Sequence, residues 1–225
     1  RTWIGTNDRG AFRWDGAAKL ERFGVAEGLP DARVWALSED REGILWLGTD
    51  SGLAKRGPAA FRTYGPEDGL PADAPIYGIA ETDDGVLWLG AHDRGLIRRD
   101  PEGRVRILTA KDGLTHTSAQ ALCAAPDGGL LVSTGEGLVR LGNGGVTPIR
   151  LPEGAPRVPT EVAFRKDGAL LLGSARKGLF VLKEGNLSRI GSPVGDSIGA
   201  LHVGPDGTVW AGGAGHRDLD EARAA

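Results

Sequence analysis

The sequence is poor in several features that mark large classes of protein. It has no methionine, one cysteine and no run of 18 or more apolar residues. A membrane-spanning helix needs about 20 predominantly apolar residues, and a signal peptide needs a basic and then apolar N-terminus, which is also missing. We therefore expect a chain that neither crosses a membrane nor carries its own export signal. Cys123 has no partner for an internal disulfide and leaves the redox compartment open.

Charge is also close to balanced. The 225 residues hold 27 Lys and Arg against 30 Asp and Glu, which gives a net charge of −3 and a pI near 5.9. Such a balance argues against a nucleic-acid partner. We also expect no direct contact with a membrane. The missing methionine, and an opening directly on a strand-like segment, predict that the chain is a piece of a longer protein.

The feature that is present in abundance is a repeat. The segment DREGILWLGTDSGL, residues 40–53, recurs five more times in altered form. The residue at its centre is aromatic or leucine in every copy, at spacings of 39 to 43 residues: Trp3, Trp46, Trp88, Leu131, Leu171 and Trp210. Periods of this length are typical of stacked or ring-closed repeat proteins.

Glycines divide each repeat into short strands. A glycine after an acidic residue stands three positions before each of the last five aligned residues, as in Glu42 and Gly43, and Asp-Gly between apolar runs indicates a hairpin. A second glycine, such as Gly52, opens a third strand, and a frayed segment near 61–64 gives a fourth. The innermost strands carry small residues at two registers, which suits strands crowded near an axis.

Four short antiparallel strands per unit predict an all-β fold, a β-propeller made of four-stranded antiparallel blades. We expect the aligned Trp or Leu to pack between neighbouring blades. The predicted boundaries are a partial first blade at 1–24, blades at about 34–65, 76–109, 119–150 and 160–191, a partial last blade at 197–214, together 1–215, and a charged non-repeat tail at 216–225. This arrangement favours an incomplete ring of about five blades from a larger propeller.

The residues aligned above resemble one family. DREGILWLGTDSGL, DDGVLWLGAHDRGL and the interblade segment FRTYGPEDGLP are similar to the two-component regulator propeller repeat, whereas later units replace Trp by Leu131 and Leu171. The resemblance implies a non-catalytic, periplasmic or extracellular sensor region of a signalling regulator. It also implies that an adjacent propeller or β-sandwich domain of the parent protein contacts this chain. A dimer of the parent protein is compatible with the resemblance.

Ligands of propellers favour the face where the loops from second to third strand and from fourth to next first strand converge. Mixed acidic, basic and imidazole groups there suit a small polar ligand or an oligosaccharide. The candidate ligand-binding residues are Asn7, Asp8, Arg33, Asp50, Asp73, His92, Asp93, Arg94, His116, Glu136, Arg157 and Arg176. The simpler alternative is that each belongs to a solvated loop.

No catalytic motif is present, and no metal site or cofactor is predicted. The four histidines are scattered, and His202 falls in a small-residue register where packing near the axis is expected. Cys123 lies in the same register and is expected to be an inert thiol. Two alternatives to a sensor remain: a metal-dependent propeller lyase or hydrolase that uses His92 and His116, and a purely structural protein-interaction scaffold.

Overall fold

The computed structural model describes residues 2–16, 20–58, 60–191, 196–213 and 221–222. These residues form β-strands, turns and three short 3₁₀ segments, η1 (Val25–Glu27), η2 (Pro66–Asp68) and η3 (Ala110–Asp112). No helix in the described part has the length and apolar character needed to cross a membrane. The chain divides into two compact units, residues 1–111 with 117–119, and residues 112–116 with 120–225.

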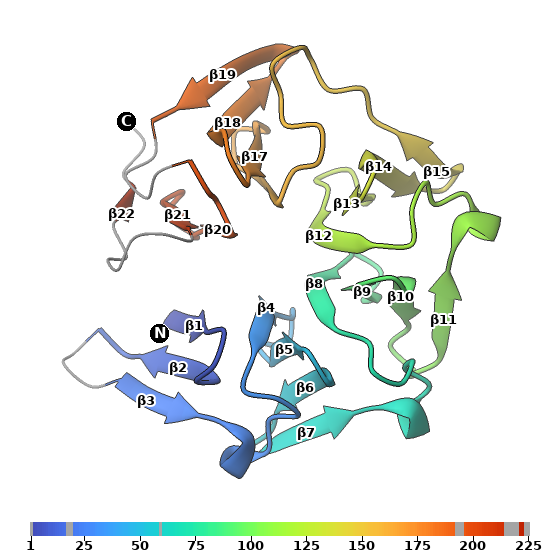
Figure 1. Cartoon of the computed structure of the whole chain (residues 1–225), viewed down its shortest axis with the longest axis vertical. Helices are drawn as coiled ribbons and strands as arrows, with labels where there is room; N and C mark the ends of the chain where they lie inside the picture. Colours follow the sequence, from blue (N-terminus) through green and yellow to red (C-terminus); the bar gives the residue numbers. More distant parts are fainter. Residues whose placement is uncertain (1, 17–19, 59, 192–195, 214–220, 223–225) are drawn as a thin grey trace. The chain divides into compact units, whose positions relative to one another are not determined.

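The first unit contains one three-stranded and two four-stranded antiparallel sheets, each with its strands in sequence order (Figure 1). The three-stranded sheet is β1 (Thr2–Gly5), β2 (Ala11–Trp14) and β3 (Leu20–Phe23). The next is β4 (Val34–Glu39), β5 (Leu45–Thr49), β6 (Gly52–Arg56) and β7 (Phe61–Tyr64). The last is β8 (Ile76–Glu81), β9 (Leu87–Ala91), β10 (Gly95–Arg99) and β11 (Val105–Leu108).

The second unit repeats this pattern, with Ala119 at the start of β12 counted in the first unit. One sheet is β12 (Ala119–Ala124), β13 (Leu130–Thr134), β14 (Gly137–Gly142) and β15 (Gly145–Pro148). The next is β16 (Glu161–Phe164), β17 (Leu170–Ser174), β18 (Gly178–Lys183) and β19 (Asn186–Ile190). The last is β20 (Ala200–Val203), β21 (Val209–Gly212) and β22 (Glu221–Ala222).

The turns between first and second strands have the geometry that the sequence predicts. The amide of Gly43 donates to the Asp40 carbonyl at 2.9 Å, and the Asp40 amide donates to the Ile44 carbonyl at 2.9 Å. Gly43 adopts φ of 75°, a left-handed conformation that glycine reaches without a Cβ clash. The Asp40 carboxylate also accepts the amide of Ile44 at 2.8 Å, so the acidic residue stabilises the turn through a side-chain bond.

Four of the six aligned residues pack between sheets of one unit, as predicted: Trp3, Trp46, Leu131 and Leu171. In the first unit the Trp46 side chain is 3% exposed and lies in a cluster with Leu53, Ile76 and Leu89, which belong to two neighbouring sheets. In the second unit Leu171 is fully buried against Ile198, which precedes the following sheet, and against Val209 and Ala211 within that sheet. A Trp buries roughly 150 to 250 Å². Since one sheet cannot cover such a side chain alone, burial ties neighbouring sheets together within each unit.

These packed four-stranded antiparallel sheets are propeller blades, so the predicted all-β propeller fold is confirmed. The predicted tail is described only at 221–222, where Ala222 pairs with Val209 and Glu221 pairs with Trp210. Residues 216–220 and 223–225 of that tail lie outside the described residues. A strand at 221–222 was not expected, because the tail sequence lacks the glycine-apolar pattern of the repeat.

Candidate functional site

In the first unit, three of the predicted site residues meet, at the residue that precedes β4, in the loop that follows β5 and in the loop that follows β1. Arg33 Nη1 lies 2.8 Å from Asp50 Oδ2, and the Arg33 Nε donates to the backbone carbonyl of Asn7 at 3.2 Å. The second Asp50 oxygen accepts the indole Nε1 of Trp35 at 2.6 Å. Both carboxylate oxygens of Asp50 are thus used to hold a guanidinium and an indole side by side.

Three aromatic rings continue from this ion pair. The ring centroids of Trp35 and Tyr77 are 4.8 Å apart at 65°, and those of Tyr77 and His92 are 5.3 Å apart at 57°. His92 Nδ1 lies 3.3 Å from Asp93 Oδ2. We call Arg33, Trp35, Asp50, Tyr77, His92 and Asp93 the aromatic cluster. Trp35 leaves 39% of its surface exposed, which is unusual for an indole and leaves apolar area open to solvent.

The electrostatics of the aromatic cluster keep Tyr77 protonated. Burial is the main cause of a raised pKa for the Tyr77 hydroxyl, and the nearby Asp50 and Asp93 carboxylates raise it further, whereas Arg33 lowers it. A neutral phenol can both donate and accept a hydrogen bond. The aromatic cluster therefore presents ring surface, a hydroxyl, a guanidinium and carboxylates together. This combination can stack on and hydrogen-bond to a polar organic molecule.

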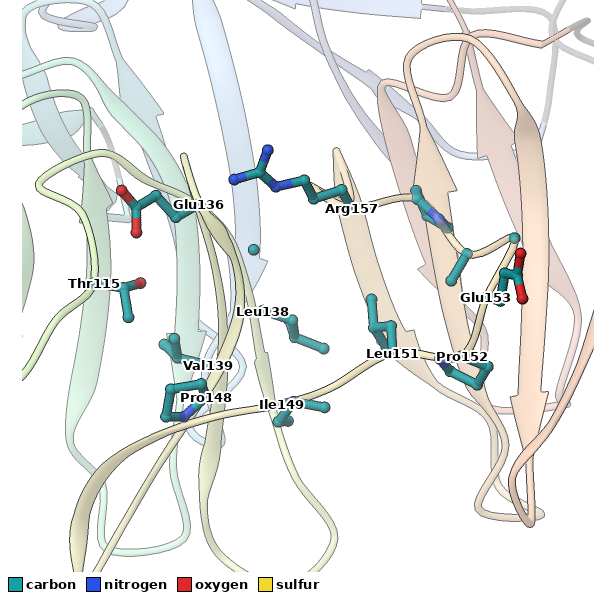
Figure 2. Close-up of a pocket in the computed structure, with 14 residues that line it drawn as sticks. Thr115, Glu136, Leu138, Val139, Pro148, Ile149, Leu151, Pro152, Glu153 and Arg157 are labelled. Carbon is teal, nitrogen blue, oxygen red and sulfur yellow. The ribbon is translucent and has the colours of Figure 1, made fainter.

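In the second unit, two further predicted residues line a pocket with a volume of about 480 Å³ (Figure 2). Glu136, from the loop after β13, and Arg157, from the connection between β15 and β16, lie along its upper edge. Leu138, Ile149 and Leu151 lie below them in the same view. The pocket thus combines an apolar floor with a charged rim. The other lining residues are Thr115, Gly137, Val139, Pro148, Pro152, Glu153, Gly154, Ala155 and Pro156.

The remaining predicted site residues do not join either group. Asp8, Asp73, Arg94 and Arg176 are exposed, and Asp8 lies 3.9 Å from the Nε of its neighbour Arg9. His116 is half-buried, and a Cβ added to Gly135 would meet its imidazole at 2.7 Å. His92 belongs to the first unit and His116 to the second. Within the described ranges, no three His, Cys, Asp or Glu side chains are grouped to hold a metal ion.

Two expectations about the inner strands had different outcomes. The prediction that His202 is packed is wrong: its side chain is exposed on β20, opposite Trp210. Its neighbours Leu201 and Val203 are half-buried and pack against a core cluster, so the alternation of side chains along the strand turns the imidazole to the opposite, exposed face. Cys123 is half-buried, and burial raises the pKa of its thiol, so the unreactive protonated form is favoured.

Sequence reasoning missed three residues at the starts of inner strands. Trp35 and Tyr77 stand at equivalent repeat positions, each directly before a small residue, Ala36 or Gly78, and this recurrence of an aromatic residue was an available signal. Glu161 occupies a register that holds Ala36, Gly78 and Ala121 in other repeats. Burial raises the pKa of its carboxyl to about 8. An acidic residue in a small-residue register was the corresponding signal.

Comparison with known proteins agrees with the repeat. The sequence model of the family described as two component regulator propeller matches residues 28–51 and 69–93. No curated protein matches the chain. The extracellular domain of the hybrid two component system BT3049 from B. thetaiotaomicron has a similar structure, with a TM-score of 0.74 at 18% identity, over 95% of this chain and 30% of that one.

Other solved structures share the fold. The extracellular domain of the one component system BT4673 from B. thetaiotaomicron gives a TM-score of 0.59 at 15% identity, over 94% of this chain and 37% of that one. Virginiamycin B lyase from Staphylococcus aureus gives a TM-score of 0.66 at 17% identity, over 93% of this chain and 80% of that one. The chain therefore spans about a third of the length of the two extracellular domains.

Proposed function

We propose that this chain is a non-catalytic sensor propeller that recognises a ligand for a two-component-type signalling regulator, a proposal supported by the match of residues 28–51 and 69–93 to the two component regulator propeller model. The observation that carries this proposal is the aromatic cluster, where Asp50 holds Arg33 and Trp35 together at 2.8 and 2.6 Å. An exposed indole fixed by a carboxylate is a preorganised surface, and preorganisation reduces the entropy lost on binding.

The ligand that this surface suits is polar and rich in hydroxyl groups, such as an oligosaccharide. The Trp35 ring can cover the apolar C–H face of a sugar, while Asp50, Asp93 and the Tyr77 hydroxyl can bond to its hydroxyls. Similarity to the extracellular domains of BT3049 and BT4673 supports a periplasmic or extracellular position. The partners in this proposal are an adjacent propeller or β-sandwich domain of the parent protein, with dimerisation through the parent.

A thermal-shift screen tests this proposal. The wild-type chain is measured with neutral and acidic oligosaccharides, and each compound that raises the melting temperature is measured again with Trp35→Ala and Arg33→Ala. We expect the shift to disappear in both variants and to persist in Arg176→Ala, which changes an exposed arginine outside the aromatic cluster. The proposal would be overturned if no compound raised the melting temperature, or if the rise were the same in wild type, Trp35→Ala and Arg33→Ala.

A second candidate function is that of a lyase, favoured by the structural similarity to virginiamycin B lyase. It predicts turnover of quinupristin, the compound present in another structure of the Staphylococcus aureus virginiamycin B lyase, and this turnover should be sensitive to a chelator and lost in His92→Ala or His116→Ala. Product formation followed by mass spectrometry separates the two candidates, because a sensor binds its ligand without converting it. Turnover that both histidine substitutions leave intact would rule out this use of the histidines.

A further inference from the structure

The floor of the pocket in the second unit is apolar, and its residues are held by burial and by a backbone hydrogen bond. Leu138 and Val139 are 2% and 1% exposed, whereas Ile149 and Leu151 are half-buried and lie at the pocket surface. The Ile149 amide donates to the Leu138 carbonyl at 2.8 Å, which fixes the two sides of the floor. A volume of about 480 Å³ lies in the range of small-molecule sites, roughly 300 to 1,000 Å³.

The two charged residues on the rim come from adjacent backbone. A Cβ added to Gly137 would lie 3.3 Å from the Arg157 carbonyl oxygen, so the segment carrying Glu136 touches the segment carrying Arg157. Their side chains nevertheless form no ion pair with each other or with any other residue in the described part of the chain. In the same unit Arg140 pairs with Asp127 at 2.5 Å, so pairing is common where the geometry allows it.

The rim is also held in place. The Thr134 hydroxyl donates to the Gly137 carbonyl at 2.9 Å and accepts the Glu136 amide at 3.4 Å. On the other side, the Ser133 hydroxyl donates to the Pro159 carbonyl at 2.5 Å, two residues after Arg157. Prolines at 148, 152 and 156 restrict the backbone of the connecting segment. The backbone segments that carry the two unpaired charges are therefore held in place beside the apolar floor.

We propose that this pocket binds a small zwitterion with an apolar side chain, of the chemical class of leucine and phenylalanine. Arg157 would pair with the ligand carboxylate, Glu136 with its ammonium group, and the apolar side chain would cover Ile149 and Leu151. A guanidinium presents a planar fork that matches a carboxylate, and a carboxylate accepts the donors of an ammonium group. This inference rests on the proposed recognition function, since both charged residues belong to the predicted ligand-binding loops, and it adds a second binding site with a ligand class of its own.

Isothermal titration calorimetry with a matched set of probes tests the assignment. L-phenylalanine carries both charges, phenylacetate only the carboxylate and phenethylamine only the ammonium group, and L-leucine replaces the ring. We expect L-phenylalanine or L-leucine to bind, with phenylacetate and phenethylamine each weaker than L-phenylalanine. Arg157→Gln should lower the affinity for L-phenylalanine and for phenylacetate by about tenfold or more, and should leave the affinity for phenethylamine unchanged. Glu136→Gln should lower the affinity for L-phenylalanine and for phenethylamine, and should leave the affinity for phenylacetate unchanged.

The controls keep the outcome decisive. Lys177→Gln removes an exposed positive charge that does not line the pocket and should leave every affinity unchanged. All three substitutions are at exposed positions, so we expect melting temperatures close to wild type. No binding of either amino acid at millimolar concentration, or binding that both rim substitutions leave unchanged, would overturn the assignment. If the amino acids fail while oligosaccharides bind through Trp35 and Arg33, the pocket inference alone falls.

Discussion

Trp35 and Tyr77 occupy equivalent positions of consecutive repeats, 42 residues apart, and their rings meet edge to face with centroids 4.8 Å apart. At the following equivalent position the chain has Gln120. The aromatic pair is therefore a local departure from the repeat, placed where β4 and β8 begin. Departures of this kind at exposed positions are more informative about function than the repeated core, because packing between sheets does not require them.

The two tryptophans of one blade should differ sharply in their effect on stability. Trp46 is 3% exposed and Trp35 is 39% exposed. Trp46→Ala creates a cavity and leaves Asp40, which accepts its indole at 2.8 Å, without that donor, so we expect a loss of roughly 3 to 5 kcal/mol. Trp35→Ala should cost about 1 kcal/mol. Urea unfolding measures both, and equal losses would contradict the division into a core indole and a surface indole.

Two glycines with the same conformation should tolerate alanine differently. Gly95 and Gly168 have φ of 88° and 80°, and an added Cβ would overlap the Leu108 carbonyl oxygen at Gly95 but would meet no atom within 4 Å at Gly168. Left-handed backbone costs an alanine about 1 to 2 kcal/mol at either site. Overpacking against a backbone oxygen should add about 1 to 3 kcal/mol at Gly95 alone. Denaturant unfolding of Gly95→Ala and Gly168→Ala tests the difference. Equal destabilisation would contradict the close approach of the Leu108 carbonyl oxygen to Gly95.

Glu161 should make stability depend on pH in a specific direction. Burial raises the pKa of its carboxyl from 4.5 to about 8, so between these values the folded state holds more protons than the unfolded state. The free energy of unfolding must therefore fall as pH rises from about 4.5 to 8, by at most about 1.4 kcal/mol per pH unit from this residue. Below pH 4.5 both states are protonated and the penalty vanishes.

The matched variant for this prediction is Glu161→Gln. Its stability relative to wild type should increase steadily across the same pH range, because the amide carries no charge to desolvate. Denaturant unfolding at half-unit pH steps gives the difference curve. A difference that stays flat between pH 5 and 8 would mean that the Glu161 carboxyl titrates normally in the folded protein.

The repeat allowed most of the fold to be predicted. Turn glycines such as Gly43 need a left-handed backbone, and central residues such as Trp46 need a neighbouring sheet to cover them, so local chemistry and spacing specify the strands and their packing. The short strand β22 could not be predicted, because its two residues carry no strand pattern and pair through their backbone with β21.

The site was less predictable than the fold. Loop positions supplied Arg33, Asp50 and His92, but the aromatic cluster also needs Trp35 and Tyr77 from inner strands. The pocket depends on Ile149 and Leu151, which lie in an irregular connection without a repeated pattern. Contacts among segments distant in sequence decide which loop residues meet, and a single sequence contains no direct record of them.

The central claim is that the aromatic cluster recognises a polar ligand, and the fluorescence of Trp35 tests it most directly. The difference in emission between the wild-type chain and Trp35→Phe reports this indole, and an oligosaccharide that raises the melting temperature of the wild-type chain should change that difference in a saturable manner. Asp50→Ala should abolish this change, because it frees the indole that Asp50 holds at 2.6 Å. Binding without any change in Trp35 emission would contradict the claim.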